Sequence, residues 1–116
     1  MLFGDSLMAG YGLDEKHHLN IQLYHDLLHH DIKTTIINAS VSGDTSFNGL
    51  KRISWSLQDD PDYILLGLGA NDMLRGIDPN TTLQNLEKII QIIQEKKDIQ
   101  TILLGMQSQE AYGEKF

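Results

Sequence analysis

The chain begins with Met1-Leu2-Phe3-Gly4-Asp5-Ser6-Leu7, an apolar run that ends in a Gly-Asp turn and a serine. Two later stretches end in the same way, Ile-Ile-Asn-Ala-Ser-Val-Ser-Gly-Asp at 36–44 and Ile-Leu-Leu-Gly-Leu-Gly-Ala-Asn-Asp at 64–72. Each apolar run predicts a short strand, and open α/β folds carry their active sites at the carboxyl ends of such strands. We therefore expect a hydroxyl, a glycine amide and a carboxamide to meet at one edge of a sheet.

The candidate site residues at these three strand ends are Ser6, Gly43 and Asn71. A serine hydroxyl can act as the nucleophile of acyl transfer when a general base takes its proton. A glycine amide and a carboxamide can stabilise the oxyanion that forms, and a carboxamide does not titrate. Each residue alone is also an ordinary turn former, so the prediction depends on their ordered combination.

The rest of the chain alternates predicted strands and helices, which favours a parallel sheet with right-handed crossovers. Strands are predicted over 1–3, 34–38, 63–68 and 101–106, and helices over 19–30, 45–57 and from Pro79 to near Lys97. The expected fold is an α/β three-layer sandwich with a parallel, flavodoxin-like sheet. Four strands and three helices are few for a domain, so we expect one domain over 1–116 that lacks its last strand and helix and a few N-terminal residues.

Apolar residues at helical spacing predict the face that each helix buries. The expected stripes are Ile21, Tyr24, Leu27 and Leu28 in the first helix, Phe47, Leu50, Ile53, Trp55 and Leu57 in the second, and Leu83, Leu86, Ile89, Ile90 and Ile93 in the third. We expect Trp55, Phe47 and Tyr63 in the core and not at a ligand-binding surface.

Composition narrows the classes of function. The 116 residues are 41% hydrophobic with a net charge of −7, which is typical of a soluble globular domain. No stripe of Lys and Arg offers contacts to nucleic acid. No apolar run approaches the roughly 20 residues of a membrane span, and the absence of cysteine excludes thiolate catalysis and Cys-ligated zinc.

The first residues do not resemble a signal peptide, because no charged segment precedes an apolar one. The sequence leaves the compartment open between periplasm and cytoplasm, and it leaves the oligomeric state open as well.

Together the motifs resemble those of the SGNH hydrolases, also called GDSL esterases/lipases, and within them the bacterial arylesterase and thioesterase I/lysophospholipase L1 group. The matching stretches are residues 2–7, 38–46, 68–76 and Ala111-Tyr112-Gly113. The resemblance implies an SGNH hydrolase fold in which Ser6 is the nucleophile and the amides of Ser6 and Gly43 form an oxyanion hole with the Asn71 side chain. It implies hydrolysis of small carboxylic esters or thioesters through an acyl-enzyme, with no metal or organic cofactor, and an acyl pocket beside residues 74–79.

The family's general base is the histidine of an Asp-x-x-His block near the C-terminus, and no such block follows the third motif in these 116 residues. Asp26-Leu27-Leu28-His29 matches the pattern, but in a predicted helix its Asp and His are surface neighbours. We therefore expect a fragment of a working esterase that is inactive by itself, because loss of a triad member costs orders of magnitude in rate.

Two other interpretations stay open. The chain could be an inactive, truncated domain that keeps the fold without turnover. It could also be a flavodoxin-like ligand-binding or signalling domain in which Asp5 and Asn71 hold a phosphate or a metal. His25 and His29 are spaced for a metal site, but no Glu follows them in the zinc-protease pattern, which favours solvated histidines.

Overall fold

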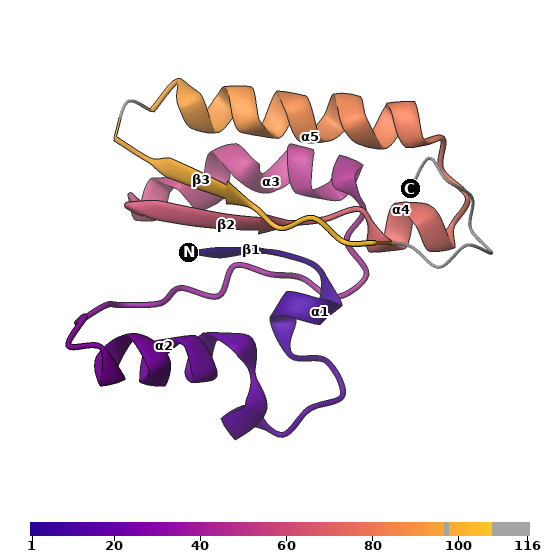
Figure 1. The fold of residues 1–116 in the computed structure, drawn as a ribbon. Coiled ribbons are helices and arrows are strands. Elements are labelled where there is room, and N and C mark those ends of the chain that lie inside the picture. Colours follow the sequence, from indigo (N-terminus) through magenta and orange to yellow (C-terminus); the bar gives the residue numbers. More distant parts are fainter. Residues whose placement is uncertain (97, 108–116) are drawn as a thin grey trace.

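The computed structural model describes residues 1–96 and 98–107 of the chain. Their parallel sheet has the order β1-β2-β3, formed by Leu2–Gly4, Tyr63–Gly67 and Gln100–Leu103. Figure 1 shows α3 (Ser46–Ser56) and α5 (Pro79–Gln94) on one face of the sheet and α2 (Leu19–His29) on the other. The predicted three-layer α/β architecture is confirmed.

A segment beside β1 replaces the strand expected over 34–38. The Leu2 amide donates to the Ile37 carbonyl at 2.8 Å, the Ala39 amide donates to the Leu2 carbonyl at 2.9 Å, and one parallel bridge joins Leu2 to Asn38. The prediction of a full strand is wrong, because a single bridge joins this segment to β1 and no ladder of successive pairs forms. The segment still lies next to β1, followed by β2 and β3, which is the flavodoxin-like order.

The observed elements differ from the predicted ones mainly in length. The structure adds two short helices, α1 (Ser6–Ala9) and α4 (Ala70–Leu74), and two 3-10 turns, η1 (Glu15–His17) and η2 (Leu57–Asp59). β3 ends at Leu103, earlier than expected. The predicted start of α5 is confirmed, because Pro79 opens the helix and the Asp78 carboxylate accepts the Asn80 amide at 2.7 Å.

The core lies between the sheet and the layer of α3 and α5. Its fully buried apolar side chains are Phe3, Ile53, Leu57, Ile64, Leu66, Ile89 and Ile93. Four expected core residues are instead on the surface: Phe47, Trp55, Tyr63 and Leu83 are 54%, 73%, 52% and 55% exposed.

Small residues explain the outward position of the α3 aromatics. The side of α3 that faces the core carries Ser46, Gly49, Ile53 and Ser56 at spacings of three and four. A Cβ at Gly49 would lie 2.4 Å from Leu68 Cδ1, so α3 packs too closely for a larger residue there. The predicted apolar stripe is therefore wrong for Phe47 and Trp55, whereas its members Ile53 and Leu57 are buried as expected.

α2 is peripheral, and none of its residues is fully buried. Tyr24 and Leu28 are 38% and 43% exposed, so the expectation that both face the core is wrong. Ile21 and Leu27 are half-buried and make the inner side of the helix.

A pair of glycines positions the start of α1. Gly4 of β1 pairs with Gly67 of β2, and the buried Met8 of α1 packs over both. A Cβ at Gly4 would lie 2.4 Å from Met8 Sδ and 2.5 Å from the Gly67 carbonyl oxygen. The missing side chains thus let α1, and with it Ser6, sit directly against the strand ends.

We expect Gly4→Ala to lower the free energy of unfolding by about 1–3 kcal/mol, because the new Cβ meets backbone that cannot move aside. Gly105→Ala is the matched control, since a Cβ there meets no described atom within 4 Å. Urea unfolding of both variants measures the difference. Equal stability of Gly4→Ala and the wild type would contradict this packing.

Candidate active site

The three predicted site residues lie at the same edge of the sheet. Ser6 opens α1 directly after β1, Asn71 lies in the first turn of α4 after β2, and Gly43 lies in the loop before α3. Because β1 and β2 are adjacent and parallel, their carboxyl ends coincide. The Val41 amide donates to the Gly4 carbonyl at 3.0 Å, which ties the Gly43 loop to the same edge.

Asp5 fixes the first turn of α1. Its carboxylate accepts the Leu7 amide at 3.0 Å as an N-cap, and the side chain is only 1% exposed. Its second oxygen has no hydrogen-bond partner among the described residues. Burial raises the pKa of Asp5 above its ordinary value, the Leu7 hydrogen bond opposes this shift, and the negative charges of Asp44 and Asp72 add to it.

The raised pKa predicts a pH dependence of stability. A carboxyl whose pKa is higher in the folded state stabilises the fold below its ordinary pKa, and this contribution is lost as the pH rises through the folded pKa. Asp5→Asn keeps the cap acceptor and removes the charge. We expect its free energy of unfolding, relative to that of the wild type, to be larger at about pH 7 than at about pH 3.5, so that the variant gains stability over the wild type as the pH rises.

Denaturant unfolding at both pH values measures this difference. A difference between Asp5→Asn and wild type that is the same at the two pH values would contradict the account of Asp5.

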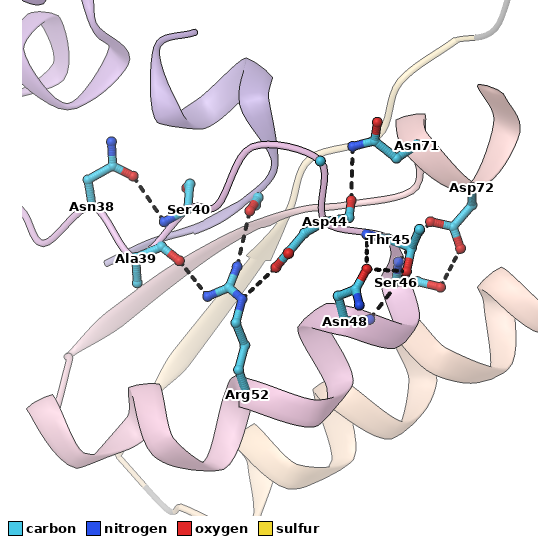
Figure 2. A network of polar contacts seen from close by, with 12 residues as sticks. Asn38, Ala39, Ser40, Asp44, Thr45, Ser46, Asn48, Arg52, Asn71 and Asp72 are labelled. Atoms are coloured by element: carbon cyan, nitrogen blue, oxygen red, sulfur yellow. Dashed lines mark hydrogen bonds and ion pairs between the residues drawn. The ribbon is translucent and has the colours of Figure 1, made fainter. Parts of the chain in front are cut away.

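Side chains of α4 and its end hold the Gly43 loop in place. The Asn71 side chain donates from Nδ2 to the Asp44 carbonyl at 3.0 Å (Figure 2), and Arg75 Nη2 donates to the Gly43 carbonyl at 2.8 Å. Gly43 has φ +87°, and a Cβ there would come no closer than 3.9 Å to Arg75 Nη2. Glycine is therefore required by the backbone conformation and not by crowding.

Three hydrogen-bond donors at this edge have no acceptor among the described residues. The amides of Ser6 and Gly43 donate to no other group within the described residues. The Asn71 carboxamide has two N–H groups and uses one of them on the Asp44 carbonyl. Backbone amides and a carboxamide are the types of donor that stabilise an oxyanion.

The start of α3 follows directly from the loop that carries Gly43. Thr45 Oγ1 accepts the Asn48 amide at 3.3 Å, and Asn48 Oδ1 accepts the Thr45 amide at 3.0 Å (Figure 2). This capping box ends the loop at a defined residue.

A buried carboxylate beneath Asn71 joins three helices. Asp72 is fully buried and accepts the Ser46 amide at 2.7 Å, the Ser46 hydroxyl and the Thr82 hydroxyl at 3.0 Å. Asn85 Nδ2 donates to the Ser46 hydroxyl at 3.0 Å. These hydrogen bonds and the positive end of the α3 dipole offset the loss of hydration of the carboxylate.

The sequence analysis missed the members of this network. Thr82 and Asn85 lie on α5 among exposed polar residues, and their burial depends on a partner in α4. One signal could have revealed them: they continue, at spacings of three and four, the buried positions Ile89 and Ile93.

An apolar hollow of about 380 Å³ is lined by Leu7 and Ala70, the sequence neighbours of Ser6 and Asn71. Its lining includes Leu7, Met73, Pro79, Leu83, Leu104 and Met106. Leu7 follows Ser6 directly and Met73 lies on the same short helix as Asn71. Of the loop that was expected beside an acyl pocket, Pro79 lines the hollow.

The described residues show neither a metal-binding cluster nor a general base that is hydrogen-bonded to Ser6. Residues 1–96 and 98–107 contain no cluster of three or more His, Asp or Glu that could hold a metal ion. His18 and His30 bind the carbonyls of Leu13 and Asp26, and no described hydrogen bond joins a histidine to Ser6.

In the part of the chain that the structure describes, no helix has both the length and the apolar character needed to cross a membrane.

The model of the GDSL-like lipase/acylhydrolase family matches residues 2–114. The chain belongs to this family. The predicted resemblance to the GDSL esterases/lipases is confirmed. The alternative of a flavodoxin-like signalling or ligand-binding domain is not supported. The matching loop at Ala111-Tyr112-Gly113 lies outside the described residues.

Two curated relatives match along the whole chain. It is 38% identical over 117 residues to an arylesterase of Vibrio mimicus, covering 100% of this chain and 58% of the relative. It is 35% identical over 119 residues to thioesterase 1/protease 1/lysophospholipase L1 of Escherichia coli K12, covering 100% of this chain and 54% of the relative. The chain thus spans little more than half the length of these proteins.

Solved structures agree with the sequence comparison. The crystal structure of AlinE4, an SGNH-hydrolase family esterase, superposes with a TM-score of 0.92 at 42% identity, over 98% of this chain and 61% of that one. A crystal structure of TesA gives a TM-score of 0.91 at 35% identity, over 98% of this chain and 63% of that one. The predicted SGNH hydrolase fold is confirmed.

Proposed function

We propose that the protein is a serine hydrolase that cleaves small carboxylic esters or thioesters through an acyl-enzyme on Ser6. The observation that carries the proposal is the meeting of Ser6, Gly43 and Asn71 at one edge of the sheet with open hydrogen-bond donors. The family and the names of its relatives, arylesterase and thioesterase 1, support this class of reaction.

Ser6 Oγ would attack the acyl carbon while a general base accepts the hydroxyl proton. The carbonyl oxygen becomes an oxyanion, which would receive hydrogen bonds from the amides of Ser6 and Gly43 and from Asn71 Nδ2. The proton then passes to the leaving alcohol or thiol, and water hydrolyses the acyl-enzyme. The apolar hollow beside Leu7 and Met73 would take the acyl chain.

The proposal requires a histidine base that the chain does not place at Ser6. All five histidines of the sequence lie between residues 17 and 30, in or beside η1 and α2. The histidine of the family's Asp-x-x-His block would fill this role in the full-length protein, which is therefore the material for the tests.

We expect Ser6→Ala in the full-length protein to lower kcat on short p-nitrophenyl esters by at least about 10⁴-fold, because no oxygen is left to form the acyl-enzyme. Asn71→Ala should lower kcat by about 10²–10³-fold with a small change in KM, since its donor acts in the transition state. Steady-state kinetics with subtraction of spontaneous hydrolysis measures both effects.

Ser54→Ala, an exposed serine of α3, is the matched control and should keep wild-type turnover. Turnover of Ser6→Ala at the wild-type rate would remove Ser6 from the mechanism. A folded wild-type protein that hydrolyses no ester or thioester would favour the inactive-domain alternative.

A further inference from the structure

Arg52 of α3 donates to three separate segments of the chain, to two backbone carbonyls and to one carboxylate. Its Nε donates to Asp44 Oδ2 at 2.6 Å, Nη1 donates to the Ala39 carbonyl, and Nη2 donates to the Gly4 carbonyl at 3.1 Å. The guanidinium also lies over the ring of Phe3, with Cζ 4.0 Å from the ring centre. Figure 2 shows the side chain extending from α3 toward Ala39 and Asp44.

Two of the three acceptor residues lie beside candidate catalytic residues in the sequence. Gly4 precedes Ser6 by two residues, and Asp44 directly follows Gly43. A guanidinium is planar, and its donors have fixed directions. Arg52 therefore fixes the distance between the end of β1, which directly precedes the Ser6 turn, and the loop that carries the Gly43 amide.

Other contacts hold the fold here but do not replace this bridge. The Gly4 carbonyl also accepts a hydrogen bond from the Val41 amide. This bond holds the chain around Val41 against β1 without Arg52. The Asp44 side chain is 13% exposed, and Arg52 supplies the positive charge beside it. Removal of Arg52 would leave this carboxylate without that charge and free the loop to shift.

We propose that Arg52 is a positioning residue, which aligns the Gly43 amide with Ser6 for oxyanion stabilisation. This inference rests on the proposed function. Oxyanion contacts form in the transition state, so misalignment of the loop lowers kcat and leaves KM nearly unchanged.

The test compares Arg52→Ala and Arg52→Lys with Lys51→Ala in the full-length protein. Lys51 is the exposed neighbour of Arg52 on α3 and serves as the matched control. Arg52→Ala is expected to lose about 10²-fold in kcat while KM stays within about threefold. Arg52→Lys should keep only part of the wild-type kcat. Lys51→Ala should keep the wild-type kcat.

Chemical rescue separates alignment from general damage. Arg52 is 21% exposed, so a small cation can enter the space that Arg52→Ala leaves. Millimolar guanidinium should restore part of kcat, whereas urea, which is neutral and of similar shape, should not. Thermal melting under each condition shows that the variant is folded.

A second readout does not depend on turnover. In protein labelled with 15N-glycine, the Gly43 amide signal should move in Arg52→Ala and return toward its wild-type position with guanidinium. If wild type shows no Ser6-dependent turnover but Gly43 responds in this way, the proposed function fails and the placement of the loop by Arg52 stands.

Three results would each overturn the inference. The first is an unmoved Gly43 signal in folded Arg52→Ala. The second is wild-type kcat in that variant. The third is a loss of activity that follows only the unfolded fraction and that guanidinium does not reverse.

Discussion

The structure depends on the close contact between α1 and the ends of β1 and β2. Gly4 and Gly67 face each other in register and leave room for Met8, so a helix begins where a larger residue would force the chain away. Ser6 is the first residue of that helix. The position of Ser6, the candidate nucleophile, thus follows from two missing side chains and one buried methionine.

The second requirement is a rigid loop opposite Ser6. Arg52, Asn71 and Arg75 donate hydrogen bonds to Asp44 and Gly43, and the Ser46 amide donates to Asp72. The four partner residues lie on or beside α3 and α4. Such a loop can present its donors without reorganising during the reaction, and this preorganisation is the main source of oxyanion stabilisation. The buried polar groups thus serve the placement of donors as well as the packing of helices.

Much of the fold and the three candidate site residues could be predicted from the sequence, because apolar runs followed by Gly, Asn and Asp mark strand ends. The buried polar contacts could not be predicted. Thr82 and Asn85 have the polar character of surface residues, and only the distant Asp72 explains their burial. Hydrophobic periodicity also misplaced Phe47, because α3 presents Ser46 and Gly49 to the core.

The most direct test is a crystal structure of the full-length protein after reaction with a small alkyl fluorophosphonate, which mimics the tetrahedral intermediate. The account predicts phosphorus bonded to Ser6 Oγ, with one phosphoryl oxygen about 2.7–3.1 Å from the Gly43 nitrogen and from Asn71 Nδ2. Phosphorus on another residue, or a phosphoryl oxygen turned away from Gly43 and Asn71, would contradict it.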